Sequence, residues 1–379
     1  MADINIENLR KEYSVPGGKE VAVDDISFTI REGEFVTLVG PSGCGKTTTL
    51  RCVAGLEIPT SGAIKFDNVD VTGVPASDRG LAMMFQNIAL YPHMTIAANI
   101  GYPLKIDGVP EDDRREQVEE AARIMQIPEL LDKHPGELSG GQQQRAALAR
   151  TIVQDPVGFL MDEPLSDLDA KLKVEIRKEI QRVHRRLSKP TLYVTHDQEE
   201  ALTMSDRIAI MNDGNLEQIG TREEVYEYPN NTFVAQFIGN PSINFVEATI
   251  EAINGSDATV TANEASLSFR VDERRGELGE GSVMLGFRPQ SVRLDHDIST
   301  ESHFAGELVL LEPVDDRALA TIEWENGELR GLVPTDQNLT EGERVNITVD
   351  VGNLYLFDPD SEELIGKSVE SAETPTDPV

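Results

Sequence analysis

The segment Gly40–Thr48 (GPSGCGKTT) has the residue types and the spacing of a phosphate-binding loop. Its glycines let backbone N–H groups curl round an anion without Cβ clashes. Lys46 supplies a mobile cation for the β- and γ-phosphates of a nucleotide, and the Thr47 hydroxyl is a potential ligand for Mg²⁺. We expect a strand over Glu34–Val39 and a helix over Lys46–Leu56, so that the N-terminus of the helix faces the phosphates.

A second segment, Leu138–Gln142 (LSGGQ), has the features of another phosphate site. Ser139 is a natural N-cap and Gln142 stands three residues later, a pattern that begins a helix, here expected through Arg145–Val153. The free N–H groups at the start of such a helix attract an anion. The segment lies in a mostly helical stretch, about residues 88–156, so we expect it on a different subdomain from the glycine loop.

Two apolar runs end in polar residues that could act on a bound nucleotide. Val157–Asp162 (VGFLMD) is expected to form a buried strand, and Glu163 follows it. Asp162 is a candidate for holding Mg²⁺, and Glu163 is a candidate for polarising an attacking water molecule. Thr191–Thr195 is expected to form another strand, with His196 at its carboxyl end, where parallel sheets bind ligands.

Taken in chain order, these segments resemble the motifs of the nucleotide-binding subunits of ATP-binding cassette (ABC) transporters. Gly40–Thr48 matches the Walker A motif, Val157–Glu163 matches Walker B, and Leu138–Gln142 matches the ABC signature. The other matches are Gln86 (Q-loop), Ser166–Asp169 (D-loop), His196 (switch histidine) and Tyr13 (the aromatic residue that stacks on adenine). Six motifs in this order are very specific, whereas a single tyrosine near the N-terminus is a weaker match.

The resemblance implies that ATP and Mg²⁺ bind in a two-chain assembly. The glycine loop of one chain and the signature of a second would enclose the same ATP, so that two copies hold two ATP molecules. The implied catalytic residues are Lys46, Gln86, Glu163 and His196, and the implied Mg²⁺ ligands are Thr47, Gln86 and Asp162. The implied nucleotide-binding residues are Tyr13, Gly40, Pro41, Ser42, Gly43, Cys44, Gly45, Lys46, Thr47, Thr48, Ser139, Gly140, Gly141, Gln142 and Asp169.

Longer stretches resemble the ATPases of sugar importers of the maltose-importer type, and this likeness covers essentially the whole chain. The stretches are Phe85–Thr95, His134–Arg145, Asp162–Leu172 and Val234–Phe245. The implied function is ATP hydrolysis that energises uptake of a sugar, such as xylose, arabinose, maltose or trehalose. The implied partners are a second copy or a paralogous ATPase, two transmembrane permease subunits and, indirectly, an extracellular sugar-binding protein. This places the chain at the cytoplasmic face of the membrane.

One residue departs from the family pattern, and one segment is expected to contact the permease. Asp167 stands where the family commonly has Ala or Asn, although the aspartate used above, Asp169, is retained. The segment Ala89–Met94, just after Gln86, is expected to line the groove where a cytoplasmic helix of the permease docks.

The order of expected elements predicts two domains and a tail. Strands alternate with helices over residues 1–235, which predicts an α/β domain with a parallel sheet and a helical subdomain over about 88–156. The resemblance implies that this domain is a P-loop NTPase of RecA-like type. A hairpin is expected over 208–220, turning at Asp213–Gly214. Short β runs over 236–366 predict a small β-barrel, which the resemblance identifies as an OB-type regulatory domain. The polar segment 367–379 is expected to be a disordered acidic tail.

The composition is strongly acidic, with 67 Asp and Glu against 34 Lys and Arg and a net charge of −33. Residues 236–379 alone hold 29 acidic and 9 basic residues. Such a balance argues against nucleic acid as a partner. It is tolerable near molar salt, where the Debye length is about 3 Å. We therefore expect a halophilic source, such as a salt-accumulating archaeon; an ordinary acidic cytosolic protein is the alternative.

Other segment types are not indicated by the sequence. No run approaches the 18 apolar residues of a membrane span, and the start, MADINIENLRKE, lacks the apolar core of a signal peptide. The two cysteines, Cys44 and Cys52, are expected to be reduced thiols of a cytosolic protein.

Three other functions stay open at this stage. Importers of polyamines, iron, phosphate esters such as glycerol phosphate, or oxyanions such as sulfate and molybdate carry similar barrels. A non-transport ABC ATPase is disfavoured because the chain has one cassette and no sustained heptads. A regulatory protein with a vestigial ATPase is disfavoured because the chain retains Lys46, Asp162, Glu163 and His196.

Overall fold

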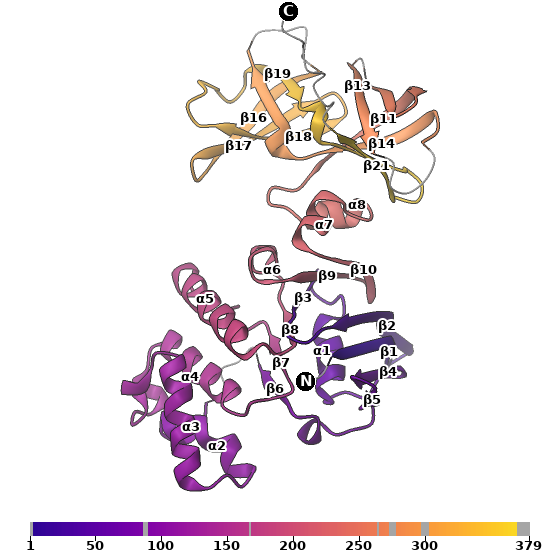
Figure 1. Cartoon of the computed structure of the whole chain (residues 1–379). Helices are drawn as coiled ribbons and strands as arrows, with labels where there is room; N and C mark the ends of the chain where they lie inside the picture. Colours follow the sequence, from indigo (N-terminus) through magenta and orange to yellow (C-terminus); the bar gives the residue numbers. More distant parts are fainter. Residues whose placement is uncertain are drawn as a thin grey trace, which may run out of the picture. The chain divides into compact units, whose positions relative to one another are not determined.

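The structure, a computed structural model, describes residues 3–85, 90–166, 168–263, 265–272, 278–296 and 303–369 (Figure 1). The chain divides into two compact units, Met1–Arg222 and Glu223–Val379. This division lies before the boundary near residue 235 that the sequence predicts. The difference arises because α8 (Thr232–Phe237) packs in the second unit, where the Arg288 guanidinium donates to the carbonyls of Ala235 and Ile238.

The first unit is organised by a mostly parallel six-stranded sheet. Its strands, in spatial order, are β10 (Asn215–Gly220), β9 (Arg207–Asn212), β3 (Phe35–Val39), β8 (Thr191–Val194), β7 (Gly158–Asp162) and β6 (Leu81–Met84). Every residue of β3, β7 and β8 is buried, as expected for parallel strands covered on both faces. The predicted β9–β10 hairpin is present, with its turn at Asp213 and Gly214, both of which have positive φ.

A second, antiparallel sheet of this unit has the order β2 (Gly18–Ile30), β1 (Ile4–Val15), β4 (Ser61–Phe66) and β5 (Val69–Asp70). The long β1–β2 pair has three register shifts, between Ile6 and Glu12. These shifts break the strict apolar–polar alternation by which a strand is recognised in a sequence. Helix α1 (Lys46–Ala54) packs on β1, β2, β7 and β8 and joins the core between the two sheets.

A group of helices forms a subdomain of its own at one side of the six-stranded sheet (Figure 1). It contains α2 (Ile96–Ile106), α3 (Glu111–Ile124) and α4 (Gly140–Ile152), which pack against one another. This arrangement agrees with the helical stretch predicted over about 88–156. Two further helices, α5 (Ala170–Leu187) and α6 (Gln198–Met204), lie between β7 and β9 in the chain. Among the described residues, no helix is both long and apolar enough to cross a membrane.

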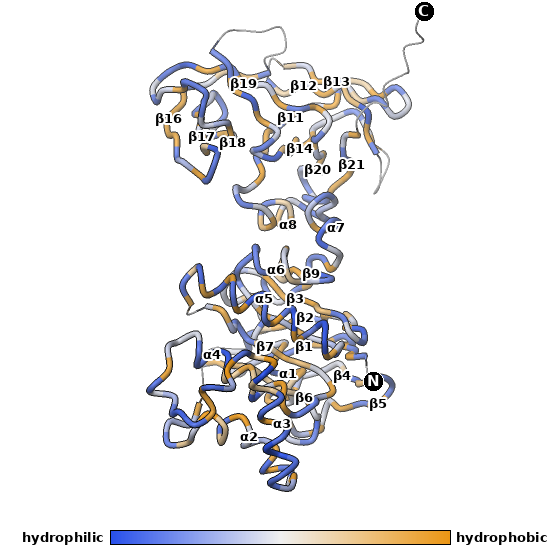
Figure 2. The backbone as a smooth tube through the Cα atoms, turned by 60° about the vertical axis from the view of Figure 1, so that its left-hand side comes forward, coloured by the Kyte–Doolittle hydropathy of each residue, from blue (hydrophilic) through white to orange (hydrophobic). Residues whose placement is uncertain are grey.

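The second unit is a β structure, as the sequence predicts. One part is a closed barrel of β11 (Asn244–Asn254), β12 (Asp257–Ala262), β13 (Ala265–Asp272), β21 (Leu364–Val369), β20 (Leu354–Phe357) and β14 (Gly281–Phe287). The other part is a five-stranded sheet of β15 (Val292–Asp295), β19 (Arg344–Val349), β16 (Phe304–Val314), β17 (Arg317–Trp324) and β18 (Gly327–Pro334). Hydrophobic residues alternate along these strands (Figure 2), and the buried ones from the barrel and from the five-stranded sheet form one continuous core.

The prediction that a disordered C-terminal tail begins at residue 367 is wrong. Lys367, Ser368 and Val369 close strand β21 and do not begin a disordered segment. Lys367 is buried because its ammonium pairs with the carboxylate of Glu227, and the Oγ atom of Ser368 accepts a hydrogen bond from the N–H of Leu354 at 2.7 Å. Two polar residues are therefore held inside by specific partners, which the polar composition alone did not indicate. Residues 370–379 lie outside the described residues.

Candidate functional site

Three neighbouring strands bring the predicted site residues to one edge of the six-stranded sheet. Strands β3, β8 and β7 are parallel and lie side by side in that order. The chain continues from their carboxyl ends into Gly40–Thr48, into His196 and into Glu163, respectively. Parallel strands bind ligands at this edge, so segments far apart in the sequence converge there.

The glycine loop has the backbone geometry that its sequence requires. Gly45, the N-cap of α1, has a φ of 102°, and a Cβ placed there would lie 2.3 Å from the carbonyl oxygen of Ala22. Only glycine fits this conformation and this close approach. The Lys46 ammonium, 6 % exposed, donates hydrogen bonds to the carbonyl oxygens of Gly40 and Pro41, both at 2.8 Å. The lysine charge is therefore held within the loop.

Thr47 and Asp162 meet beside this loop. The Thr47 hydroxyl donates to Oδ1 of Asp162 at 3.1 Å, which joins the start of α1 to the end of β7. Burial raises the pKa of the Asp162 carboxyl, and the hydrogen bond from Thr47 opposes this shift. A hydroxyl and a carboxylate are the oxygen ligands that Mg²⁺ prefers, so the residues present fit that ion.

Glu163 and His196 form the second contact across the sheet edge. Nδ1 of His196 lies 3.0 Å from Oε2 of Glu163. A carboxylate only accepts, so Nδ1 carries the proton in this contact. Glu163 has a φ of 43°, in the left-handed region, and its N–H is held by the carbonyl of Val194 at 2.9 Å. Backbone strain of this kind persists where the surroundings fix it, often at functional sites.

A buried carboxylate that the sequence did not single out supports the histidine. Glu200 is 2 % exposed, and its Oε2 accepts hydrogen bonds from the hydroxyls of Tyr193 and Thr195, both at 2.7 Å. Burial and the nearby Glu200 carboxylate raise the pKa of Tyr193 well above its ordinary value. Thr195 also accepts from the N–H of Asp197 at 3.0 Å, so the residues on both sides of His196 are anchored.

Replacing Glu200 with Ala is expected to lower the free energy of unfolding by at least about 2 kcal/mol, because two buried hydroxyl donors lose their acceptor. Chemical denaturation followed by circular dichroism measures this loss. Glu199→Ala is the matched control, since the Glu199 side chain is 72 % exposed and its ion-pair partner among the described residues is Arg177, a kind of pair worth about 0–1 kcal/mol. Equal stability of the two variants would contradict the anchoring role of Glu200.

The signature segment begins α4 as the sequence predicts. The Ser139 Oγ atom accepts from the N–H of Gln142, whose side chain accepts in return from the N–H of Ser139, a complete capping box. At Gly141 a Cβ would lie 2.6 Å from a methyl group of Leu172, so glycine permits α4 to approach α5 closely. The amide of Gln144, which the sequence did not indicate, donates to the carbonyl of Pro164, directly after Glu163.

The other residues singled out by the sequence lie outside the edge formed by β3, β8 and β7 or outside the described residues. Oδ1 of Asp169 caps α5 by accepting from the N–H of Leu172 at 3.1 Å. Tyr13 lies half-buried on β1, and the ammonium of Lys11 sits 4.9 Å from the centre of its ring. Gln86 and Asp167 lie outside the described residues. The catalytic, nucleotide-binding and metal-binding roles of all the predicted site residues stay predictions.

Comparison with known proteins shows the family of this chain. The family model described as "ABC transporter" matches residues 23–166. A xylose/arabinose import ATP-binding protein of Haloferax volcanii is 42 % identical over 382 residues, which cover 99 % of this chain and 97 % of that protein. The chain belongs to the ABC transporter family. As an ABC transporter ATP-binding protein, it is an ATP hydrolase coupled to transport.

Two further likenesses bear on this ABC protein. An sn-glycerol-3-phosphate import ATP-binding protein of Yersinia enterocolitica is 41 % identical, covering 95 % of this chain and 98 % of that one. A dimeric ATP-binding cassette solved in a post-hydrolysis state with ADP and Pi is 29 % identical, with a TM-score of 0.52. That match covers 58 % of this chain and 98 % of the solved chain. The cassette fold expected from the sequence is thus confirmed.

Proposed function

We propose that this chain energises the import of a neutral sugar, with ATP hydrolysed at the edge formed by β3, β8 and β7. The observation that carries the catalytic part is the convergence of Lys46, Asp162, Glu163 and His196 at that edge. The sugar is supported by the xylose/arabinose relative, which matches 99 % of the chain, including its β unit.

Each residue has a distinct part in the proposed hydrolysis. Lys46 and the N–H groups of the glycine loop bind the β- and γ-phosphates. Glu163 orients the attacking water and accepts its proton, while His196, held at 3.0 Å by Glu163, stabilises charge on the γ-phosphate. Thr47 and Asp162 would hold Mg²⁺, with Gln86 added by the sequence motif. When bound, that ion neutralises charge on the phosphates.

The site is proposed to be completed by a second chain. The capping box leaves N–H groups at the start of α4 that an anion could bind, yet α4 belongs to the helical subdomain and not to the sheet edge. Supply of this segment by a second copy gives a C2 arrangement with two shared sites, and a paralogous ATPase would form the corresponding pair of unlike chains. Hydrolysis then depends on closure of the two chains.

The permease partners are proposed to dock on the helical subdomain. A groove of about 650 Å³ lies between α2 and α3. Its lining includes apolar residues such as Met94, Ala97 and Val118 and charged residues of both signs, such as Arg114 and Glu111. Met94 belongs to the segment 89–94 that the sequence predicts at this interface, although Ala89 lies outside the described residues. An amphipathic cytoplasmic helix fits such a groove, and the sugar-binding protein would act through the permease.

Growth of a deletion strain tests the substrate. A strain lacking this gene is expected to lose growth and uptake of labelled sugar on one of xylose, arabinose, maltose or trehalose, and to recover with the wild-type gene. The Lys46→Ala gene should fail to restore uptake. Loss of growth on sn-glycerol 3-phosphate alone would favour the second candidate, an importer of phosphate esters, which the Yersinia relative supports.

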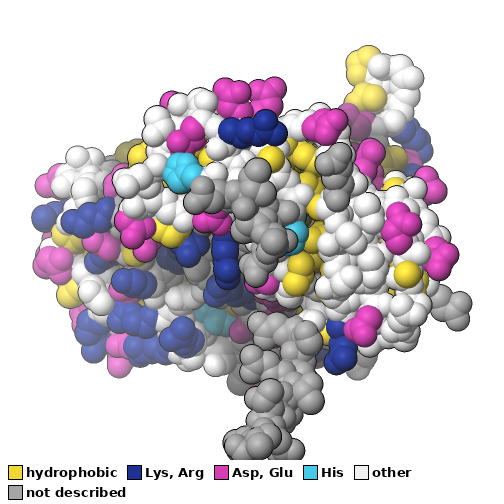
Figure 3. Space-filling model, turned by 90° about the horizontal axis from the view of Figure 1, so that it is seen from above, with side chains coloured by type: hydrophobic (Ala, Val, Ile, Leu, Met, Phe, Trp, Pro, Cys, Tyr) yellow, Lys and Arg dark blue, Asp and Glu magenta, His cyan; other side chains and the backbone are white. Residues whose placement is uncertain are grey.

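The charge of the chain predicts that folding depends on salt. The chain has a net charge of −33, and Figure 3 shows scattered Asp and Glu side chains on one face together with a group of Lys and Arg side chains at its left. The repulsion among the acidic side chains is screened over about 10 Å at 0.1 M salt but over about 3 Å at 1 M. We expect circular dichroism and ATPase activity to be lost as KCl is diluted and to return when it is restored. Full structure and activity in dilute buffer would contradict a halophilic source.

A further inference from the structure

The backbone of Glu163 has a conformation that the chain does not favour by itself. Its φ of 43° lies in the left-handed region, which is uncommon for residues other than glycine. The residue that follows is Pro164, and a residue before a proline favours a negative φ and an extended backbone. Such a conformation persists where neighbouring groups fix it. The contacts around Glu163 therefore decide where its carboxylate lies.

Three hydrogen bonds hold Glu163 from the sheet and from its own loop. Its N–H donates to the carbonyl of Val194 on β8 at 2.9 Å. Its carbonyl accepts from the N–H of Ser166 at 3.2 Å and from the Ser166 hydroxyl at 3.0 Å. Both backbone groups of Glu163 are thus paired with β8 or with the loop after β7.

A further contact reaches this loop from the helical subdomain. Nε2 of Gln144, on α4, donates to the carbonyl of Pro164, one residue after Glu163. Gln144 is 2 % exposed, and Pro164 is buried. A buried carbonyl needs a donor, and the side chain of Gln144 supplies it. The amide therefore fixes the loop directly after its least favoured conformation.

The helix that carries Gln144 is itself firmly placed. Helix α4 packs on α2, α3, α5 and β6, and its residues 146–149 are all buried. At Gly141 the helix lies so close to α5 that a Cβ would be 2.6 Å from a methyl group of Leu172. Ser139 caps the same helix about 7.5 Å before Gln144 along its axis. Gln144 thus joins the signature helix to the loop that bears Glu163.

Another buried hydrogen bond of α4 provides a comparison. Thr151 is 6 % exposed, and its Oγ1 atom donates to the carbonyl of Ala147 at 3.0 Å. Donor and acceptor belong to the same helix, one turn apart, so this bond can stabilise α4 but does not reach the ATP site. Gln144 differs because its acceptor lies beside Glu163. The two side chains therefore form a matched pair for experiments.

We propose that Gln144 is a positioning residue for ATP hydrolysis, which keeps the Glu163 carboxylate in place by binding the Pro164 carbonyl. In this role Gln144 acts through Glu163 and needs no contact with the nucleotide. The inference rests on the proposed role of Glu163 as general base. Removal of the Gln144 donor should therefore affect the rate of the chemical step and not the binding of ATP.

Gln144→Met tests this role, because methionine keeps the length of the buried side chain but removes the donor. We expect kcat to fall about 10–10²-fold, the effect of a small misplacement of a reacting group, while KM for ATP stays as in the wild type. Steady-state ATPase assays of the full-length protein in concentrated KCl measure both constants. Gln144→Asn, whose amide is one methylene shorter, is the second variant and should lose kcat in the same way. Circular dichroism checks that both variants fold.

The Glu163→Gln background separates a positioning role from a structural one. If Gln144 acts through the Glu163 carboxylate, Gln144→Met should slow the wild type but hardly slow the residual hydrolysis of Glu163→Gln. A merely structural role would slow both backgrounds by the same factor. Wild-type turnover of Glu163→Gln alone would contradict the general base, whereas equal factors in the two backgrounds would contradict only the positioning role.

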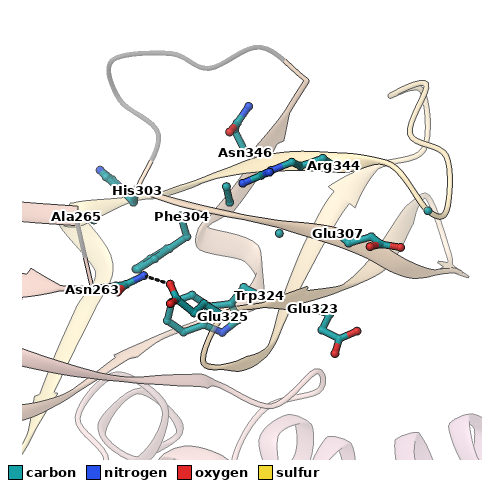
Figure 4. A pocket seen from close by; sticks show the side chains of 13 residues that line it. Asn263, Ala265, His303, Phe304, Glu307, Glu323, Trp324, Glu325, Arg344 and Asn346 are labelled. Carbon is teal, nitrogen blue, oxygen red and sulfur yellow. Dashed lines mark hydrogen bonds between the residues drawn. The ribbon is translucent and has the colours of Figure 1, made fainter.

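Two controls remove hydrogen bonds elsewhere. Thr151→Val removes the buried donor on α4 and should lower stability slightly but leave kcat unchanged. In the second unit, Nδ2 of Asn263 donates to Oε2 of Glu325 at 3.1 Å, beside a cavity of about 790 Å³ (Figure 4). Asn263 has a φ of 55°, a conformation that aspartate also adopts, so Asn263→Asp removes this donor without new backbone strain. It should likewise leave kcat unchanged.

Three results would overturn the proposal. One is a wild-type kcat in Gln144→Met and Gln144→Asn when both are folded. Another is a loss of kcat in Gln144→Met that recurs by the same factor in the Glu163→Gln background. The third is an equal loss of kcat in Thr151→Val, because that loss would come from a weakened helix.

Discussion

Replacing Glu163 with Gln is expected to slow ATP hydrolysis by about 10²–10⁴-fold, because an amide cannot accept the proton of the attacking water. ATP binding should persist, since the glycine loop and Thr47 are untouched. The variant should accumulate as an ATP-bound dimer, which size-exclusion chromatography with ATP and Mg²⁺ detects. Its backbone is expected to stay in place, because the Glu163 N–H is held by Val194 and not by the side chain.

The contact between Glu163 and His196 sharpens this experiment. His196→Ala removes the imidazole whose Nδ1 lies 3.0 Å from Oε2 of Glu163, but it leaves the Glu163 carboxylate in place. The variant should therefore hydrolyse ATP more slowly while Glu163 keeps its role as base. Glu116→Gln, an exposed carboxylate on α3, is the control and should hydrolyse ATP normally. Near-normal turnover of Glu163→Gln would remove this residue from the role of general base.

Much of the ATP site could be predicted because its residues follow local patterns. The glycine loop, the buried strand before Asp162 and the N-cap at Ser139 each depend on a few consecutive residues, and the structure has β3, α1, β7 and α4 at those places. The positive φ of Gly45 likewise belongs to the loop itself, whereas the need for glycine at position 141 comes from Leu172 of α5, which is remote along the chain. A short sequence pattern therefore predicts both the type of element and the end of that element at which the polar residues lie.

The contacts that hold the site together could not be predicted in this way. Glu200 satisfies Tyr193 and Thr195 only because α6 folds back on β8, and Gln144 reaches Pro164 only because α4 packs beside the loop after β7. Such contacts depend on tertiary packing, which has no fixed spacing in the sequence. The buried Lys367 was missed for the same reason, because its partner Glu227 is remote along the chain.

The sharing of each ATP site between two chains predicts recovery of activity on mixing. Lys46→Ala removes the charge that the glycine loop holds beside Gly40 and Pro41, and it should abolish most ATP hydrolysis by the homodimer. Ser139→Asp places a negative charge where the γ-phosphate is expected. Because aspartate is as good an N-cap as serine, this change spares the start of α4 and should inactivate the homodimer without unfolding the helix.

A heterodimer of these two variants keeps one intact site, built from Lys46 of one chain and Ser139 of the other. If the chains exchange at random and the sites act independently, an equal mixture should regain about one quarter of wild-type turnover. Steady-state ATPase assays on mixed and separate samples measure this recovery. A Lys46→Ala, Ser139→Asp double variant mixed with itself is the control and should stay inactive. Absence of recovery in the mixture, with exchange of chains verified by tagged copies, would contradict a shared site and would place Ser139 outside the ATP-binding machinery.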